Sequence, residues 1–138
     1  MKQLTQFLFE SLAKPKTKEE LRKLIENMVK NKNFKELNYI DTSNITDMRR
    51  LFEDLDIGDI NISNWDVSNV TDMSFMFAGC ENFNSDLSNW DVSNVKNMCG
   101  MFMGCKNFNC DISHWDVSRV KDMRNAFKNC ETQPNWYK

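Results

Sequence analysis

The sequence has little glycine, almost no proline and one histidine: four, two and one among 138 residues. So few glycines and prolines exclude a flexible linker or a low-complexity chain, and no second histidine exists for a His-based metal site. There is no excess of one charge, because 18 Lys and Arg stand against 20 Asp and Glu. A nucleic-acid or anionic-membrane binder would show a basic excess. No apolar run approaches the roughly 20 residues that span a bilayer.

Signals for catalysis and secretion are equally scarce. There is no glycine-rich phosphate loop, and Asp and Ser recur throughout the chain, so no Ser/His/Asp arrangement stands out. We therefore expect a non-catalytic protein without a cofactor. The apolar stretch in residues 1–10 is too short and too interrupted for a signal peptide, and no lipidation cysteine lies near it. As the chain stands, we expect a cytoplasmic protein.

What the sequence has in abundance is repetition. The segment Trp-Asp-Val-Ser-Asn-Val at residues 65–70 recurs at 90–95 and, with one change, at 115–120. The 25 residues from Trp65 match the next 25 at 16 positions without a gap. A degenerate first copy begins at Ile40. A fixed period in this range is typical of stacked repeat proteins, which here gives three full copies and a truncated fourth.

Four sets of residues recur at the 25-residue step and are expected to face a common core. They are Ile45, Val70, Val95 and Val120; Met48, Met73, Met98 and Met123; Phe52, Phe77, Phe102 and Phe127; and Leu55, Cys80, Cys105 and Cys130. Within a copy these positions lie three to four residues apart, as on one helix face. We predict short helices near 45–54, 69–79, 94–104 and 119–129. One short strand per copy, centred on Leu87 or Ile112, would pair in parallel with its neighbours.

The chain divides into a helical cap over 1–36, the repeats over 37–130 and a tail over 131–138. Thr17 and Glu20 form a capping box, and the apolar stripe that follows comprises Leu21, Leu24, Ile25, Met28 and Val29. We predict that this helix covers the first copy. In the tail, Pro134, Trp136 and Tyr137 break the pattern, and we predict that they plug the open end of the core.

The unit that runs from Trp65 to Ser88 resembles the bacterial surface-protein repeats called mycoplasma-lipoprotein-type repeats, which are of unknown function. Those are similar to BspA-like leucine-rich repeats, whose coils carry an Ala-Phe-x-x-Cys-x-x-Leu segment like residues 76–83. The resemblance covers residues 40–130. It implies an α/β solenoid, a leucine-rich-repeat-like right-handed coil of about four 25-residue strand-helix repeats behind an N-terminal helical cap.

The same resemblance implies recognition or adhesion and leaves a cell-surface location open, although the chain shows no lipobox and no wall-anchoring tail. The segment over residues 1–11 resembles the N-terminal targeting peptides of internal head proteins of large tailed phages. That second resemblance leaves a virion location open as well.

The five cysteines are of two kinds. Cys80, Cys105 and Cys130 share a column with Leu55, so we expect buried structural thiols. Cys99 and Cys110 fall in polar columns and are expected to be accessible. Their spacing is not that of a zinc site, and an odd count favours a reducing compartment.

An acidic column consists of Asp41, Asp66, Asp91 and Asp116, each two residues before a serine. Asx turns, in which the carboxylate accepts from the backbone two residues on, are the favoured interpretation. Calcium held between copies is the alternative, although the segment lacks the glycine and the terminal glutamate of an EF-hand loop. The recurring tryptophans are expected to pack at the core or its edge rather than to form a carbohydrate-stacking strip.

These patterns predict a non-catalytic protein-interaction or adhesion module that binds through the strand surface. Its expected binding positions are variable and outward-facing: Ser63, Asn64, Ser85, Ser88, Asn89, Cys110, Ser113 and His114. The expected partner is a protein, with no nucleic acid and no membrane insertion, and self-association through the open C-terminal coil is a further expectation. Two alternatives are a small assembly or decoration protein, phage-encoded in one version, and a calcium-dependent adhesin.

Overall fold

The computed structural model of the chain describes residues 14–58 and 60–138. The segment that resembles a phage targeting peptide lies outside these residues. Helix α2 spans Lys18–Lys30, and a single 3-10 turn, η1, spans Leu37–Tyr39. Thr17 caps α2, because its hydroxyl oxygen accepts from the Glu20 N–H at 3.1 Å. Of the described residues, none belongs to a helix long and apolar enough to cross a membrane.

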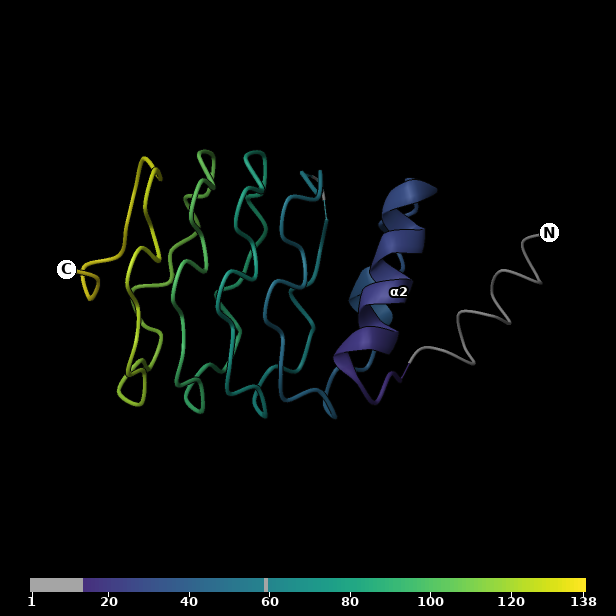
Figure 1. Cartoon of the computed structure of the whole chain (residues 1–138), viewed down its shortest axis with the longest axis horizontal. Helices are drawn as coiled ribbons and strands as arrows, with labels where there is room; N and C mark the ends of the chain where they lie inside the picture. Colours follow the sequence, from purple (N-terminus) through teal and green to yellow (C-terminus); the bar gives the residue numbers. More distant parts are fainter. Residues whose placement is uncertain (1–13, 59) are drawn as a thin grey trace.

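The predicted face of α2 is confirmed. Leu21, Leu24, Ile25 and Met28 are buried, and Figure 1 shows the helix covering one end of the rest of the molecule. The Glu20 carboxylate accepts from the Lys16 N–H at 2.9 Å, so a second free amide at the start of the helix is bonded to a side chain. Local signals therefore placed this element correctly.

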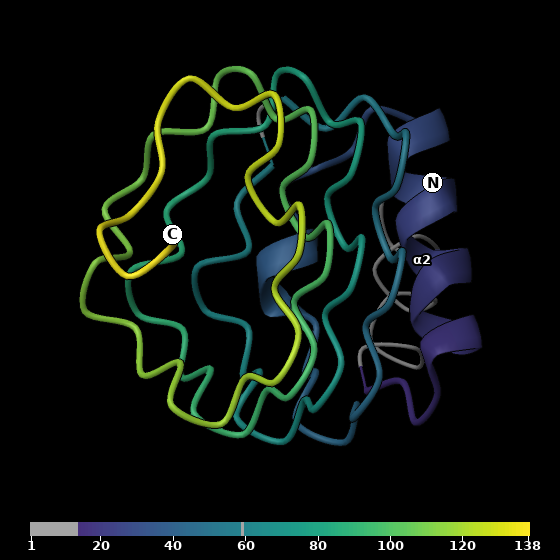
Figure 2. The same cartoon turned by 60° about the vertical axis from the view of Figure 1, so that its left-hand side comes forward.

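Beyond η1 the chain runs in successive layers that lie side by side along the long axis (Figures 1 and 2). We number them layers 1 to 4, for residues 40–64, 65–89, 90–114 and 115–138. Single parallel bridges join Asp47 to Asp72, Asp72 to Asn97 and Asn97 to Asp122. Residues one copy apart in the sequence are thus neighbours in adjacent layers.

The predicted α/β solenoid of strand-helix repeats is wrong. The segments 45–54, 69–79, 94–104 and 119–129 are turns with isolated bridges rather than helices. In layer 2 the N–H groups of Met73, Phe75, Phe77 and Gly79 donate to carbonyl oxygens of layer 3 at 2.8–2.9 Å. The intervening N–H groups of Met76, Ala78 and Cys80 donate three residues back along the chain. An α-helix needs every amide to donate four residues back, so this alternation excludes one.

Backbone dihedrals exclude a helix a second time. Each layer carries two residues with positive φ, four positions apart: Arg50 and Asp54, Phe75 and Gly79, Gly100 and Gly104, and Asn125 and Asn129, with φ from 55° to 79°. An α-helix keeps φ near −63° throughout. The glycines at 79 and 104 therefore serve the left-handed conformation inside a turn rather than the exit from a helix.

The predicted strands are also absent from the described residues. Around Leu87 and Ile112 the chain is irregular, and the only bridges lie where helices were expected to begin. In this stretch Asp86 and Asp111 accept the N–H groups of Ser88 and Ser113, so these two amides make no cross-layer bond. Without strands or repeating helices, the leucine-rich-repeat-like coil is excluded as well.

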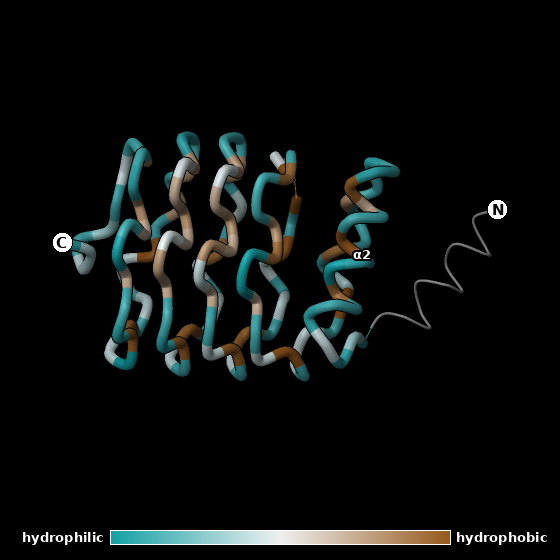
Figure 3. Tube along the Cα trace, in the orientation of Figure 1, coloured by the Kyte–Doolittle hydropathy of each residue, from teal (hydrophilic) through white to brown (hydrophobic). Residues whose placement is uncertain are grey.

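The core is a set of aligned columns, as the period predicted. The rings of Phe52, Phe77, Phe102 and Phe127 stack on one another with centroids 5.3, 5.5 and 5.2 Å apart. Offset pairs of this kind add about 0.5–1.5 kcal/mol each beyond the area that they bury. Figure 3 shows apolar residues at the same place in successive layers. The columns are buried in layers 1 to 3, except for the half-buried Leu55, and become half-buried at Val120 and Met123 in layer 4.

Tryptophans form a second ladder, and the tail completes it. The indole N–H groups of Trp65, Trp90 and Trp115 donate to the backbone carbonyls of Leu37 in η1, Ile62 in layer 1 and Leu87 in layer 2, at 2.7–3.1 Å. Trp136 continues the series on the Ile112 carbonyl at 2.9 Å, and Tyr137 packs edge-on to Phe127. The predicted plugging of the core by the tail is confirmed.

Two glycines in left-handed conformation give a matched test of this architecture. A Cβ on Gly100 would lie 2.4 Å from the Phe75 ring, whereas a Cβ on Gly104 would meet nothing closer than 3.6 Å. Gly104→Ala should lower the free energy of unfolding by about 1 kcal/mol through its positive φ alone. Gly100→Ala should lower it by about 2–4 kcal/mol, since overpacking is added. Urea unfolding followed by circular dichroism measures both, and equal losses would contradict the layer contact at Gly100.

Candidate functional site

The residues predicted to form a binding face are exposed to different degrees. Asn64, Asn89, Ser113 and His114 are exposed, while Ser63, Ser88 and Cys110 are half-buried. Ser85 is buried, with 7% of its surface exposed, so the expectation of an outward-facing side chain is wrong there. Ser85 falls between exposed neighbours in an extended segment, and its side chain therefore points to the opposite side from theirs. The face also lies on turns rather than on strands.

The exposed members form a line across the layers. Ser63 and Asn64 occupy a turn in layer 1, and the equivalent pairs occupy turns in layers 2 and 3. Nε2 of His114 lies 2.6 Å from the Ser88 carbonyl oxygen, which ties the turn of layer 3 to that of layer 2. One further residue stands in this line: Tyr39, 25 positions before Asn64, is the large hydrophobic side chain with the greatest exposure among the described residues, at 72%.

We call this line the turn ridge; its members are Tyr39, Ser63, Asn64, Ser88, Asn89, Ser113 and His114. Sequence reasoning missed Tyr39, although one more 25-residue step back from Asn64 reaches it. It was missed because the degenerate first copy was taken to begin at Ile40. The Ser88 hydroxyl donates to the Asp86 carboxylate at 2.6 Å, and Nε2 of His114 is on the Ser88 carbonyl. The phenol, the two asparagine amides and Nδ1 of the imidazole are among the groups left to meet a partner.

Asx turns fix the ridge and the neighbouring acidic column. The Oδ1 atoms of Asp41, Asp66, Asp91 and Asp116 each accept from the N–H two residues on, at 3.0 Å. This confirms the favoured interpretation of the column. The Ser93 hydroxyl and amide hold the pKa of Asp91 below its usual range, and Ser88 does the same for the pKa of Asp86. Among the described residues no group of three His, Cys, Asp or Glu could hold a metal ion.

Four of the five thiols are hydrogen-bonded to the scaffold, and the fifth, Cys99, is half-buried. Cys80, Cys105 and Cys130 donate to the carbonyls of Phe52, Phe77 and Phe102 at 2.8–3.0 Å. Burial raises the pKa of Cys80 to about 12. Cys80 and Cys105 are buried as expected, while Cys130 is half-buried. The half-buried Cys110 accepts from the Leu87 N–H at 3.4 Å, and burial raises its pKa too. A thiol held protonated in this way is a poor nucleophile.

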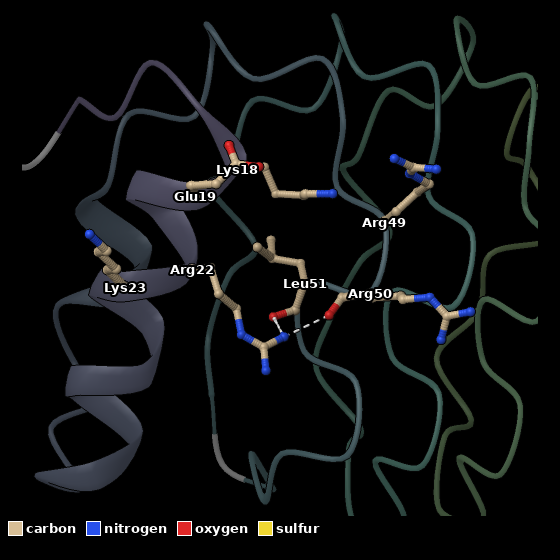
Figure 4. Close-up of a pocket in the computed structure, with 7 residues that line it drawn as sticks. All are labelled: Lys18, Glu19, Arg22, Lys23, Arg49, Arg50 and Leu51. Carbon is tan, nitrogen blue, oxygen red and sulfur yellow. Dashed lines mark hydrogen bonds between the residues drawn. The ribbon is translucent and has the colours of Figure 1, made fainter.

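A second candidate is the cleft between α2 and layer 1, which is drawn in Figure 4. Its lining includes five basic residues: Lys18, Arg22, Lys23, Arg49 and Arg50. Four of them already have anionic partners. Lys18 lies 3.3 Å from Asp47 and Arg49 lies 3.4 Å from it, Arg22 lies 2.7 Å from Glu26, and Arg50 pairs with Glu53.

Arg22 shows what the cleft does. Its Nη1 donates to the carbonyl oxygens of Arg50 and Leu51 at 2.7 and 2.8 Å (Figure 4). In layer 2 the carbonyl equivalent to that of Leu51 belongs to Met76, and it accepts from the Phe52 N–H of layer 1. Arg22 thus supplies the donor that a preceding layer would have supplied. The cleft is a joint that closes the N-terminal end of the stack.

A family model describes this chain over residues 19–136, and its description reads "Mycoplasma protein of unknown function" (DUF285). The match takes in nearly all of α2, layers 1 to 3 and most of layer 4, so the chain belongs to this family. No curated protein and no solved structure matches the chain. The resemblance to mycoplasma-type repeats is therefore shown, whereas the likeness to BspA-like leucine-rich repeats gains no support.

The Asx turns predict how stability depends on pH. Because Ser93 lowers the pKa of Asp91 from 3.8, the carboxylate stabilises the fold above that value, and this contribution is lost as the pH falls through the lowered pKa. Asp91→Asn keeps the acceptor oxygen and removes one titrating group. The variant should fold, and its melting temperature should fall less than that of the parent between about pH 5 and about pH 2. Circular dichroism melts measure the difference, Asp91→Ala is the control that loses the acceptor, and identical pH profiles for parent and Asp91→Asn would contradict the assignment.

The cleft gives a matched pair of variants. Arg22→Met leaves two carbonyls of layer 1 without their donor and should lower the free energy of unfolding by about 1–2 kcal/mol. Lys23→Met is the control, because Lys23 lines the same cleft but is exposed and makes no hydrogen bond or ion pair with other described residues. It should change that free energy by less than about 0.5 kcal/mol. Equal effects in denaturant unfolding would show that α2 does not close the stack through Arg22.

Proposed function

We propose that this member of the family is a non-catalytic protein-interaction module that binds a polypeptide along the turn ridge. The observation that carries the proposal is Tyr39, whose side chain is 72% exposed in the same 25-residue register as Asn64, Asn89 and His114. Tyrosine is enriched at protein interfaces, where its ring supplies contact area and its hydroxyl a hydrogen bond. Most large apolar side chains here are buried, so an exposed tyrosine in that register favours a contact role.

The scaffold supports such a role. Side-chain contacts tie the ridge turns to their neighbours, since the Asn64 N–H donates to the Asn38 side chain at 2.7 Å and His114 reaches the Ser88 carbonyl. Turn bonds such as Ser63 N–H to Asn61 at 3.0 Å fix each turn locally. A partner would therefore lose less free energy in ordering this surface than in ordering a mobile loop. The amides of Asn64 and Asn89 can each donate and accept hydrogen bonds, which suits the backbone of an extended polypeptide, and His114 keeps Nδ1 beside its contact with the Ser88 carbonyl.

The acidic column lends no support to the calcium-dependent alternative. One oxygen of each carboxylate already accepts from a turn amide, and an ion between layers would have to compete with these bonds. A protein partner on the ridge makes no such demand. The proposal covers adhesion too, as the case in which the bound protein belongs to another cell.

The test uses a triple variant: Tyr39→Ala, Asn64→Ala and Asn89→Ala. These three side chains make no hydrogen bond with other described residues, so the variant should keep the melting temperature of the parent. Peptides selected from a random display library against the parent protein should bind the variant at least about tenfold more weakly, since interface tyrosines are frequent hot spots. Fluorescence anisotropy measures the dissociation constants.

The matched control is a second exposed column one layer apart, Thr46→Ala, Thr71→Ala and Lys96→Ala. It changes the same number of exposed residues at the same spacing and should leave the affinity of the selected peptides within about twofold. Selected peptides that bind the ridge variant as tightly as the parent would reject the turn ridge as the binding surface.

A further inference from the structure

The alternating cross-layer hydrogen bonds of the turn segments have one direction, whereas the N–H groups of Thr71, Lys96 and Lys121 donate back to the preceding layer. Alternate N–H groups of layers 1, 2 and 3 donate to carbonyl oxygens of the next layer, as Arg50 does to Ser74, Phe75 to Cys99 and Gly100 to Arg124, at 2.8–3.0 Å. Within the described residues no layer follows layer 4, because the tail leaves the repeat and Trp136 and Tyr137 pack back against layers 3 and 4. Its equivalent N–H groups belong to Met123, Asn125, Phe127 and Asn129, which we call the donor row.

The donor row has no acceptor in residues 14–58 and 60–138. The intervening amides behave differently, because Ala126, Lys128 and Cys130 donate to carbonyls three residues back. The row therefore presents every second N–H along an edge, as an unpaired strand does. At the other end of the stack, by contrast, Arg22 donates to the Leu51 carbonyl. At the first end a side chain of α2 bonds the free carbonyls, whereas at the last end the tail covers the core and leaves the donor row without acceptors.

The surroundings of the donor row are basic. A hollow between layer 4 and the end of the tail takes in Met123 and Asn125 together with Lys121, Tyr137 and Lys138. Residues 115–138 carry five basic and three acidic side chains, and one of these acids, Asp122, already lies 2.8 Å from Arg124. Layer 2, in the middle of the stack, carries four acidic side chains and no basic one.

We propose that the donor row is a docking site for an extended, acidic polypeptide segment of another protein, whose alternate carbonyl oxygens accept from these N–H groups. Backbone N–H groups at this spacing are best matched by the carbonyl oxygens along one edge of an extended polypeptide. Acidic side chains on the segment would meet Lys121 and Lys138. This site lies on the last layer, apart from the turn ridge, and does not rest on the function proposed for the ridge.

A second copy of this chain fits the donor row poorly. Two copies meeting by their open ends would set N–H groups against N–H groups. A head-to-tail arrangement would bring the donor row against α2, which covers the carbonyls of layer 1. It would also set two basic regions together, because residues 14–39 carry eight basic and four acidic side chains. The geometry therefore favours a different polypeptide with an acidic edge.

Two peptides taken from the chain itself provide the probe and its control. The probe is residues 71–81 with Cys80→Ser, which has Asp72 and Glu81 and no basic residue, and whose carbonyls accept from layer 1 within the stack. The control is the equivalent segment, residues 121–131 with Cys130→Ser, which carries three basic and two acidic residues. The probe should bind about tenfold more tightly than the control, because the probe is acidic and the control carries a net positive charge, like the surroundings of the donor row.

The readout is the amide spectrum of ¹⁵N-labelled full-length protein during titration with each peptide. The amides of Met123, Asn125, Phe127 and Asn129 should shift and become protected from hydrogen exchange, whereas those of Ala126 and Lys128 should change little. Lys121→Glu combined with Lys138→Glu should weaken the probe about tenfold. The matched variant Lys32→Glu with Lys35→Glu, near the other end, should not.

Three outcomes would overturn the proposal. The probe could leave the four amides unshifted at saturating concentration, or it could shift residues of the turn ridge instead. Thirdly, the four amides could already be protected in the free protein, more so as its concentration rises, which would make a second copy the occupant. Each of these outcomes is independent of the peptide selection on the ridge variant, so failure here and failure of the ridge are told apart.

Discussion

The alternation of backbone donors governs this molecule. In the turn segments of layers 1 to 3 every second N–H reaches the next layer and the others bond three residues back. This pattern fixes the distance between layers, requires two left-handed residues per layer, and sets the rings of Phe52, Phe77, Phe102 and Phe127 in contact. The side-chain columns follow from the backbone ladder, because residues one copy apart are brought into register by it. Thiols and indoles add a second bond to carbonyls that already accept the N–H three residues on.

Part of this fold could be predicted from the sequence. The 25-residue period gave the columns, and the buried Met73, Phe77 and Cys80 follow from it directly. Helix α2 was predictable because Thr17 and the apolar stripe are local signals. The secondary structure of the layers was not, since apolar positions three to four apart fit a chain of tight turns as well as a helix. The distinguishing signal was weak: Arg50 and Phe75 share a column with Gly100, and only the glycine suggests a positive φ.

The candidate surfaces divide in the same way. Exposure at Asn64, Asn89 and His114 could be predicted from variable columns, while the burial of Ser85 could not, because it depends on which way an irregular segment turns. Tyr39 was within reach of the period. The donor row was not, since it consists of backbone groups whose availability depends on which layer is last. Side-chain patterns do not show which backbone N–H groups lack an acceptor. The basic character of the final layer is the one part of this site that is visible in the sequence.

The repetition of the same cross-layer bonds from one layer to the next also bears on how proteins of this kind change in size. Each layer bonds to the next through equivalent donors and acceptors, so the contacts of an internal layer do not depend on the number of layers in the stack. Recombination between copies in a gene would insert or delete one whole layer and leave both ends as they are, with α2 on the first and the exposed amides on the last. Length can therefore vary among descendants of one gene while the two termini keep their different chemistry.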